Sequence, residues 1–518
     1  MHLTQGLHRA LQQRPDAVAT VFGPRCTTFG ALAGRVARLA GAFARLGLSK
    51  SDRIAMLALN SDRYVEALLA AWWLGAVACP LNTRWSVPEI IDALNDCGAR
   101  ALMVDDACVP LLDELRAGTT ALEQVVHAGE QPAPEGTLDW EGLLAGAEPL
   151  EDARPAGDTL AAILYTGGTT GTPKGVMLSH ANLWVSAVAR MAEVPNPVNG
   201  VSLLVAPLFH VAGLGRVVSQ MVNGSTSVLL PAFRAETVLA TLQNERITDV
   251  MLVPSMLQML LDHPAFPDTD LRHLERIIHG ASPISPGLLE RAMKALPHCG
   301  FLSVYGMTET AATACSNGPL RWHEGVRLGP AELAAGRACF GNEVRIVDAE
   351  GRELPRNAVG EIVLRGANVM QGYWNKPVET RAALRDGWLH TGDGGFMDDA
   401  GRVHVVDRVK DMIISGGENV YSAEVEAVLS RHAAVAACAA IGIPSAAWGE
   451  AVHAVVVLRP GASATEEALR AHCRSRLAGY KCPKTVEFRD ALPLSPAGKV
   501  LKTVLREPFW GAGARQVN

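Results

Sequence analysis

Apolar and polar positions follow two alternating periods in the first part of the chain. Apolar residues at helical spacing predict helices over Thr28–Leu46, Val65–Leu74 and Val87–Cys97. Short apolar runs between these helices predict strands over Arg53–Leu59, Ala76–Pro80 and Arg100–Val104. Strands and helices that alternate in this way are typical of a parallel sheet. A second block with the same alternation extends from residue 160 to about residue 340.

The pattern changes in the last third of the chain. From Glu343 onward, short strands separated by turns (EVRIVDAEGRELP, GEIVLRG, GRVHVVDR) predict a small antiparallel or barrel-like unit. After Asp411, the chain has strands of its own over Ala437–Ile443 and Val452–Leu458, with helices over Ser422–Ser430 and Thr465–Leu477. Residues 130 to 158 are rich in Gly, Pro, Glu and Ala and are predicted to form a surface loop. We therefore predict an α/β fold, with a large N-terminal domain over residues 1–409 and a small α+β C-terminal domain over residues 410–518.

Composition narrows the classes of function. The chain has 518 residues, of which 48% are hydrophobic and 19% charged, and its net charge is −6. Its basic residues are scattered, so no electrostatic footprint for nucleic acid is expected. The ten cysteines form no CxxC pair, which favours reduced, mostly buried thiols and a cytoplasmic location. The longest apolar run, Ala67–Leu81, is too short for a bilayer and includes Pro80, so no transmembrane segment is predicted.

The most specific segment is Tyr165–Gly175, YTGGTTGTPKG, which follows an apolar strand. So many glycines and threonines disfavour helix and central strand, but their N–H groups and hydroxyls can surround anionic oxygens. Lys174 adds a compact positive charge. The segment differs from the Walker A pattern because no Gly-Lys-Ser/Thr follows. A flexible surface loop is the structural alternative.

Three further segments offer groups that suit a nucleotide. In SVYGMTET, Tyr305 can stack on a purine, Thr308 can bind a phosphate oxygen and Glu309 can bind Mg²⁺. His390–Asp393 reads HTGD, and its carboxylate suits two hydroxyl donors. Gly280–Pro283 reads GASP, where small residues permit close approach of a ligand. Taken singly, each segment could also be an ordinary turn.

These segments, together with DRVKDMIISGGENV at Asp407–Val420 and LSPAGKVLK at Leu494–Lys502, occur in a family's order and spacing. The chain resembles the adenylate-forming, AMP-binding superfamily over nearly its whole length, in the branch of acyl- and aryl-CoA synthetases, including fatty-acid and hydroxycinnamate CoA ligases. The family loop usually begins Thr-Ser-Gly-Thr-Thr-Gly. Here Gly167 stands in place of the serine, which removes one hydroxyl.

The resemblance implies roles for individual residues. Lys499 would hold the acid against the α-phosphorus, Lys410 would be the pivot between the domains, and His210 would shield the carboxylate at the acid pocket. ATP and AMP binding is implied for Thr166, Gly167, Gly168, Thr169, Thr170, Gly171, Lys174, Gly280, Ala281, Ser282, Tyr305, Gly306, Thr308, Asp393 and Arg408. A coenzyme A tunnel is implied for Ser415, Gly416, Gly417, Glu418 and Asn419. The acyl pocket is implied for His210, Val211, Gly213, Gly215, Met307 and Ala311, and Glu309 would be the metal ligand.

The implied activity is ATP-dependent acid:CoA ligation, with ATP, Mg²⁺ and coenzyme A required. An acyl-adenylate forms with release of pyrophosphate, and a thioester then forms with release of AMP. The small, apolar candidate pocket, which also includes Gly280, Ala281, Gly306 and Ala312, fits a fatty or aromatic monocarboxylate and supplies no second charge. His210 stands where amino-acid-activating relatives carry Asp, which disfavours an amino acid.

Two alternatives of different kinds remain. An adenylation enzyme could load a carrier protein instead of coenzyme A, and a dependence assay on coenzyme A separates the two. A non-catalytic nucleotide- or acyl-binding protein would be expected to lack Lys499 or Glu309, and both are present. The oligomeric state is open, with a homodimer among the options.

Overall fold

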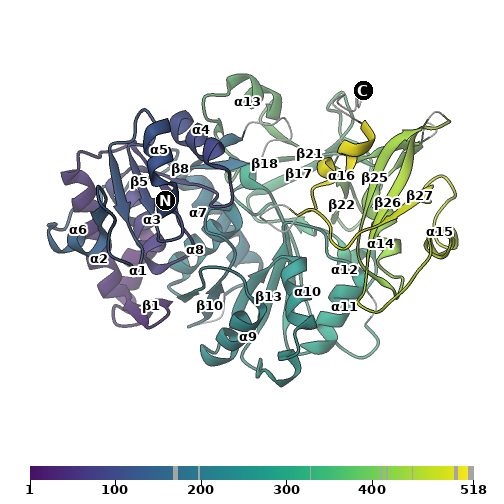
Figure 1. Cartoon of the computed structure of the whole chain (residues 1–518), viewed down its shortest axis with the longest axis horizontal. Helices are drawn as coiled ribbons and strands as arrows, with labels where there is room; N and C mark the ends of the chain where they lie inside the picture. Colours follow the sequence, from purple (N-terminus) through teal and green to yellow (C-terminus); the bar gives the residue numbers. More distant parts are fainter. Residues whose placement is uncertain are drawn as a thin grey trace.

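The computed structural model describes residues 1–166, 173–196, 199–326, 328–408, 411–415, 418–445, 447–494 and 500–510, without the side chains of Asp407, Arg408 and Asn419. Two mainly parallel sheets flanked by helices come first along the chain, followed by an antiparallel sheet and a C-terminal α+β unit (Figure 1). This arrangement confirms the predicted α/β fold class.

The first sheet is built largely from the N-terminal third of the chain. Its spatial order is β19 (Gly372–Tyr373), β9 (Lys174–Ser179), β8 (Leu160–Thr166), β4 (Val77–Pro80), β3 (Arg53–Leu57), β5 (Ala101–Val104), β6 (Gln124–His127) and β7 (Leu138–Asp139). From β8 to β7 neighbouring strands run parallel, with Ile54 opposite both Ala78 and Ala101. The predicted helices are α2 (Phe29–Arg45), α3 (Asp62–Leu74) and α4 (Val87–Cys97). Ser61 caps α3 by accepting a hydrogen bond from Tyr64 N, and Gly75 ends it with a φ of 82°.

The second sheet combines the middle of the chain with its first two strands. Its order is β16 (Arg337–Ala338), β15 (Cys315–Leu320), β14 (Gly300–Tyr305), β13 (Arg276–Gly280), β12 (Asp249–Leu252), β10 (Val201–Leu204), β11 (Thr226–Leu229), β1 (Val18–Phe22) and β2 (Arg25–Thr28). Strands β14 to β1 run parallel. The carboxyl ends of β13 and β14 therefore lie side by side, and they carry the segments that begin at Gly280 and Tyr305.

Two helices lie between the sheets. Helices α7 (His180–Glu193) and α8 (Val211–Asn223) pack against each other and contribute Leu183, Leu214 and Val217 to a core that also contains residues of both sheets. The other helices of this part are α1 (Gln5–Gln13), α5 (Leu112–Gly118), α9 (Ala235–Asn244), α10 (Pro254–Asp262), α11 (Pro286–Ala295), α12 (Pro330–Leu333) and α13 (Pro377–Ala383).

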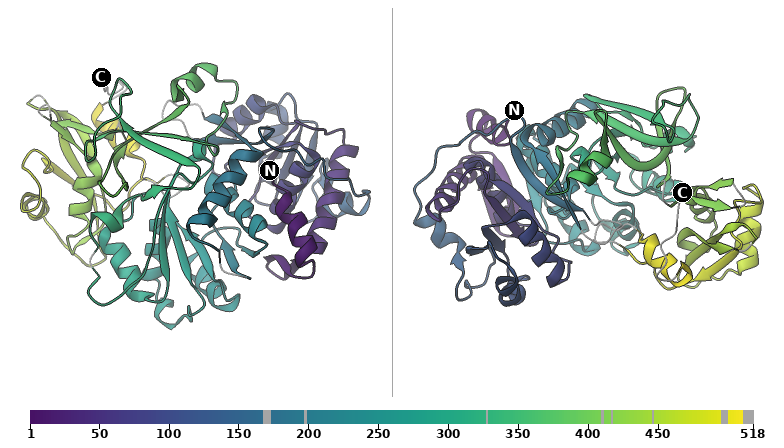
Figure 2. Two further views of the ribbon diagram at one scale, coloured as in Figure 1. Left: turned by 180° about the vertical axis from the view of Figure 1, so that it is seen from behind. Right: turned by 90° about the horizontal axis from the view of Figure 1, so that it is seen from above.

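The antiparallel sheet contains β17 (Asn342–Val347), β18 (Gly360–Gly366), β21 (Trp388–Met397), β20 (Leu384–Arg385) and β22 (Val403–Arg408). A separate sheet contains β24 (Glu418–Val420), β23 (Ile413–Ser415), β26 (Gly449–Leu458), β25 (Val435–Ser445) and β27 (Thr485–Phe488), with α14 (Ser422–Leu429), α15 (Glu466–Arg474) and α16 (Lys502–Trp510). Figure 2 shows this C-terminal unit at the end of the molecule opposite the N-terminal helices. The domain boundary at residue 410 stays a prediction, consistent with the change of sheet between Arg408 and Ile413.

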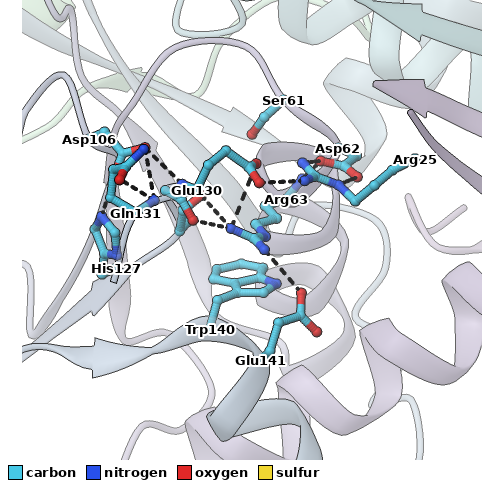
Figure 3. A network of polar contacts seen from close by, with 12 residues as sticks. Arg25, Ser61, Asp62, Arg63, Asp106, His127, Glu130, Gln131, Trp140 and Glu141 are labelled. Atoms are coloured by element: carbon cyan, nitrogen blue, oxygen red, sulfur yellow. Dashed lines mark hydrogen bonds and ion pairs between the residues drawn. The ribbon is translucent and has the colours of Figure 1, made fainter. Parts of the chain in front are cut away.

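The prediction of a surface loop over residues 130–158 is wrong in part. The segment contains β7 and α6 (Trp140–Ala145), and Trp140 is buried with its indole N–H donating to Glu66 Oε2 at 3.0 Å. Trp140, Leu143 and Leu144 stand at helical spacing and belong to the same hydrophobic core as α2 and α3. The Gly and Pro residues around them obscure this pattern in the sequence. Figure 3 shows Arg63, next to this helix, between the carboxylates of Glu130 and Glu141.

Two further features concern the state of the cysteines and the lengths of the apolar helices. The ten cysteines all lie within the described residues, eight of them are buried, and none of the ten forms a disulfide. Within the parts of the chain that the structure describes, no helix is both long and apolar enough to span a bilayer.

Candidate active site

The two ends of the Gly/Thr segment are held by a β-hairpin. Thr166 ends β8 and lies opposite Lys174, the first residue of β9, and its Oγ1 donates to Lys174 O at 3.4 Å. Gly167, Gly168, Thr169, Thr170 and Gly171 lie outside the described residues, so their phosphate-binding role stays a prediction. The hairpin holds both ends of the segment side by side in the first sheet.

Tyr373 joins Lys174 to Glu309. Because Tyr373 on β19 pairs with β9, its ring lies under Lys174, whose Nζ is 5.2 Å from the ring centroid. The Tyr373 hydroxyl donates to Glu309 Oε1 at 2.8 Å. The sequence pattern did not predict this residue. Its only signal is an aromatic residue in the segment QGYWNKP, which resembles a turn.

The Glu309 carboxylate suits a magnesium ion. Glu309 is 6% exposed and lies on a short 3₁₀ helix, Thr308–Thr310, directly after β14. Mg²⁺ is commonly bound by one or two protein carboxylates together with substrate phosphates, and Glu309 offers a carboxylate next to Tyr373 and Lys174. The residues present therefore fit the expected metal.

Tyr305 and Asp393 form the second polar pair. The Tyr305 hydroxyl donates to Asp393 Oδ2 at 2.8 Å, and Asp393 is 7% exposed. Burial and the neighbouring Asp393 carboxylate raise the pKa of Tyr305 well above its usual value, so the phenol stays protonated and donates. Thr391 Oγ1 accepts from Asp393 N at 3.0 Å within β21. Arg408 lies opposite Asp393 in the β21–β22 ladder, and its side chain lies outside the described residues.

Small residues bring three backbone segments close together between these pairs. A side chain at Gly280 would overlap Val304 O, and one at Gly306 would overlap Ala312 O. Ala281, Ala311 and Ala312 have φ values of 65°, 51° and 86°, a strained conformation for residues other than glycine. Ser282 follows as a half-buried residue. The positions of Gly280 and Gly306 therefore accept no larger side chain without a shift of the neighbouring backbone.

A cavity of about 90 Å³ opens beside the Gly306 turn. Its lining includes Val211, Gly215, Ala281, Gly306 and Ala312 from the sequence-predicted pocket. Gly213 instead packs against Pro207 O, and Ala311 is buried in the adjoining core with Met307 against it. The lining also contains Arg190 and Arg216, so the expectation that no second charge is present does not hold for this cavity.

His210 is the N-terminal cap residue of α8. Its ring is 4.6 Å from that of Phe209, and its Nε2 has no hydrogen-bond partner among the described residues. Burial, with a smaller contribution from Arg84, lowers the pKa of His210 to about 4. His210 is therefore a neutral imidazole at neutral pH.

The residues predicted for the second half-reaction belong to the C-terminal unit. Ser415 and Glu418 face each other at the end of the β23–β24 hairpin. Asn419 lies on β24, and Gly416 and Gly417 lie outside the described residues. Lys410 and Lys499 also lie outside them. Leu494 and Val500, which flank the segment of Lys499, form an antiparallel bridge, and Arg506 Nη1 lies 2.6 Å from Asp411 Oδ1 next to the predicted hinge.

Comparisons with known proteins cover almost the whole chain. The family model of AMP-binding enzymes matches residues 7–374, and the model of the AMP-binding enzyme C-terminal domain matches residues 424–499.

Named relatives match over similar lengths. A feruloyl-CoA synthase of Amycolatopsis is 40% identical over 503 residues, 97% of this chain and 98% of the relative. A fatty acid–acyl-carrier-protein ligase of Streptomyces coeruleorubidus is 37% identical over 512 residues, covering 98% and 96%. The ATP-bound crystal structure of MatB from Rhodopseudomonas palustris matches with a TM-score of 0.88 and 32% identity, covering 98% of this chain and 99% of that one.

Proposed function

The chain belongs to the AMP-binding enzyme family and is an ATP-dependent, AMP-forming acid:CoA ligase, and we propose that its acid is an aromatic or fatty monocarboxylate. Two polar pairs that flank one turn carry the assignment of the site. Tyr305, which is bonded to Asp393, precedes Gly306 in the chain, and Glu309, which is bonded to Tyr373, follows it. Gly306 itself lines the cavity. This spacing favours adjacent positions for nucleotide, metal and acid.

The first half-reaction joins two anions. A carboxylate oxygen attacks the α-phosphorus of ATP, the bond to the β-phosphate oxygen breaks, and pyrophosphate leaves. Lys174 and the segment after Thr166 hold the β- and γ-phosphates, while Tyr305 and Asp393 hold the nucleoside. Mg²⁺ bound at Glu309 supplies charge neutralisation for the phosphates. Lys499 holds the carboxylate near the α-phosphorus and offsets the developing charge.

The second half-reaction transfers the acyl group to sulfur. The thiol of coenzyme A attacks the carbonyl carbon of the acyl-adenylate, the bond to the phosphate oxygen breaks, and AMP leaves. Lys499 and the Ser415–Asn419 hairpin both belong to the C-terminal unit and serve different half-reactions. We infer that this unit rotates about Lys410 between the two steps.

The size of the cavity bears on the acid. The relatives include an enzyme named for ferulate and one named for fatty acids. A cavity of about 90 Å³, closed on one side by α7 and α8, favours a compact aromatic acid over a long alkyl chain. His210 directly precedes α8, whose residues line the cavity, and we assign to it the exclusion of water from the reacting carboxylate.

Delivery to a carrier protein is the second candidate, and one relative carries that name. The purified protein should be given ATP, Mg²⁺ and a panel of acids, with coenzyme A or a phosphopantetheinylated carrier protein as acceptor. We expect coenzyme A to be the better acceptor, with AMP and acyl-CoA formed in equal amounts. Thioester formation on the carrier protein alone would overturn this assignment.

Lys499→Ala is the control for the same assay. We expect it to reduce acyl-adenylate formation by several orders of magnitude and to leave ATP binding and thermal stability nearly unchanged. Retention of a tenth of the wild-type rate would contradict the role of Lys499. The cytoplasmic location and the homodimer remain proposals, which fractionation and light scattering test.

A further inference from the structure

A group of buried arginines surrounds one acidic residue behind the cavity. Arg190 on α7, Arg216 on α8 and Arg276 at the start of β13 are 5%, 4% and 5% exposed. Arg216 forms an ion pair with Asp249, and Arg276 Nη2 lies 3.7 Å from the same carboxylate. Asp249 thus pairs with two of the three guanidinium groups, and its one negative charge leaves the cluster with excess positive charge.

Arg190 is the least compensated member of this cluster. Its Nη2 donates to Asn196 Oδ1 at 3.2 Å, whereas its Nε and Nη1 find no hydrogen-bond partner in the described chain. Arg216 donates through Nη2 to Ser202 and Asp249, and its Nε and Nη1 are likewise unpaired within those residues. A buried donor without an acceptor costs about 1–3 kcal/mol, and more when it is charged. These four atoms are sealed from solvent on two side chains that line the cavity, so a ligand would pair with them once a guanidinium group turns toward the cavity.

The unpaired groups belong to residues that line the cavity. Arg190 follows Ser186 and Ala187 on the cavity face of α7, and Arg216 follows Ala212 and Gly215 on that of α8. Along α8 the lining extends from Val211 to Ser219, which corresponds to about 12 Å of helix. The Gly306 turn, where the proposed nucleotide site begins, belongs to the same lining. An acid that fills the cavity would therefore lie between the Gly306 turn and the two arginine side chains.

Arg190 remains charged despite its burial. Burial and repulsion from Arg216 lower the pKa of Arg190 to about 9, which still leaves it protonated at neutral pH. Burial alone would raise the pKa of Asp249, yet Arg216 and Arg276 hold it below its usual value, so Asp249 is ionised and already engaged. Asp249 favours the charged form of Arg190 but forms its ion pairs with Arg216 and Arg276, so an acceptor oxygen from the ligand would give Arg190 a direct partner.

We propose that Arg190 and Arg216 bind an acceptor oxygen at the far end of the acid, so that the enzyme selects acids with an oxygen remote from the reacting carboxylate. This proposal rests on the proposed function, because it assigns the cavity to the acid. The oxygen belongs to a ring hydroxyl or to a second carboxylate, two groups with the same acceptor chemistry. A plain alkyl tail would leave the guanidinium donors unpaired and is therefore disfavoured.

The first test compares matched acids with the wild-type enzyme. 4-Hydroxycinnamate is compared with cinnamate, and adipate with hexanoate, by AMP release with coenzyme A present. We expect kcat/KM to be about 10- to 100-fold higher for the oxygenated member of at least one pair, in line with a hydrogen bond to a charged group. The pair that shows the preference identifies the source of the oxygen. Equal or lower values for both oxygenated acids would overturn the proposal, whereas no AMP from any acid would count against the proposed function instead.

The second test removes the charge. Arg190→Met keeps the bulk of the side chain without its donors, so the oxygenated acid should lose its advantage and the preference should fall toward one or reverse. Arg190→Lys keeps the charge and should retain part of the preference. The control is Arg63→Met, a buried arginine that binds Ala128 O and lies outside the cavity lining. An equal preference in Arg190→Met and Arg63→Met would overturn the role of Arg190. If Arg190→Met does not fold, the wild-type acid pairs and Arg190→Lys still decide the question.

Discussion

The Tyr305 hydroxyl donates a hydrogen bond of 2.8 Å to Asp393 Oδ2 across 88 residues of sequence. Tyr305 ends a strand of the second parallel sheet, whereas Asp393 lies in the antiparallel sheet. The bond fixes the carboxylate that we assign to the ribose of ATP. It therefore joins two sheets at the point where the nucleotide is proposed to bind.

Tyr305→Phe tests this relationship. The variant keeps the aromatic face and removes the donor, so we expect KM for ATP to rise about 10-fold while KM for the acid changes little. Tyr480→Phe, an exposed tyrosine in the C-terminal unit, is the matched control. If both variants show the same KM for ATP, the Tyr305–Asp393 pair does not serve the nucleotide.

Glu309→Gln tests the magnesium site. Removal of one negative charge should shift the Mg²⁺ titration of activity to higher concentration, with partial rescue at high Mg²⁺. Tyr373→Phe, which removes the 2.8 Å hydrogen bond to Glu309 Oε1, should shift the titration in the same direction by a smaller amount. The exposed Glu343 provides the control Glu343→Gln. A titration curve of Glu309→Gln that overlies the wild-type curve would remove the metal from this residue.

Lys410→Pro tests the proposed hinge. Proline fixes φ, so the substitution should block rotation of the C-terminal unit without altering the chemistry of adenylation. We expect pyrophosphate release without coenzyme A to continue, while thioester formation from preformed acyl-adenylate falls steeply. Lys410→Ala separates loss of the side chain from loss of backbone freedom. Equal effects of proline on both half-reactions would remove the hinge and leave the ligase assignment unaffected.

Three buried histidines predict how stability depends on pH. Burial lowers the pKa of His180, His210 and His279 to about 4. The unfolded chain binds protons at these residues near pH 6.5, whereas the folded chain does not, so the free energy of unfolding should fall as the pH decreases from about 7 to 4. His279 alone accounts for a loss on the order of 3 kcal/mol. Urea unfolding at several pH values measures this loss.

His279→Gln should flatten part of this dependence, because glutamine does not titrate. His323→Gln, at an exposed histidine, is the control and should leave the slope unchanged. The same slope in His279→Gln and in the wild type would contradict the explanation of acid sensitivity by buried histidines.

Much of the site could be predicted because its residues follow strands. Tyr305 ends an apolar strand of a parallel sheet and Glu309 follows it, at the strand ends where ligands bind in such sheets, whereas Asp393 lies in the antiparallel sheet and its role was implied by the family resemblance. Tyr373 could not be predicted in the same way, since only the pairing of β19 with β9 brings it to Lys174.

The burial of Arg190, Arg216 and Trp140 could not be predicted from the local sequence pattern. Arg190 stands seven residues after Leu183, on the buried face of α7, yet an arginine near a helix end is usually solvated. Arg190 is buried where α7 packs against α8, and Arg216 is buried with Asp249 of β12. Neither contact can be seen in the local sequence. The burial of Trp140 was missed for a different reason, because residues typical of loops surround its short helix.

The fate of the two carboxylate oxygens tests most directly whether the acid reacts through an acyl-adenylate. A carboxylic acid labelled with ¹⁸O in both oxygens should be converted with ATP and coenzyme A, and the products analysed by mass spectrometry. If the acid attacks the α-phosphorus, one labelled oxygen appears in AMP and the other stays in the thioester carbonyl. Unlabelled AMP, or label in inorganic phosphate together with ADP, would contradict an acyl-adenylate intermediate and with it the AMP-forming mechanism of this enzyme.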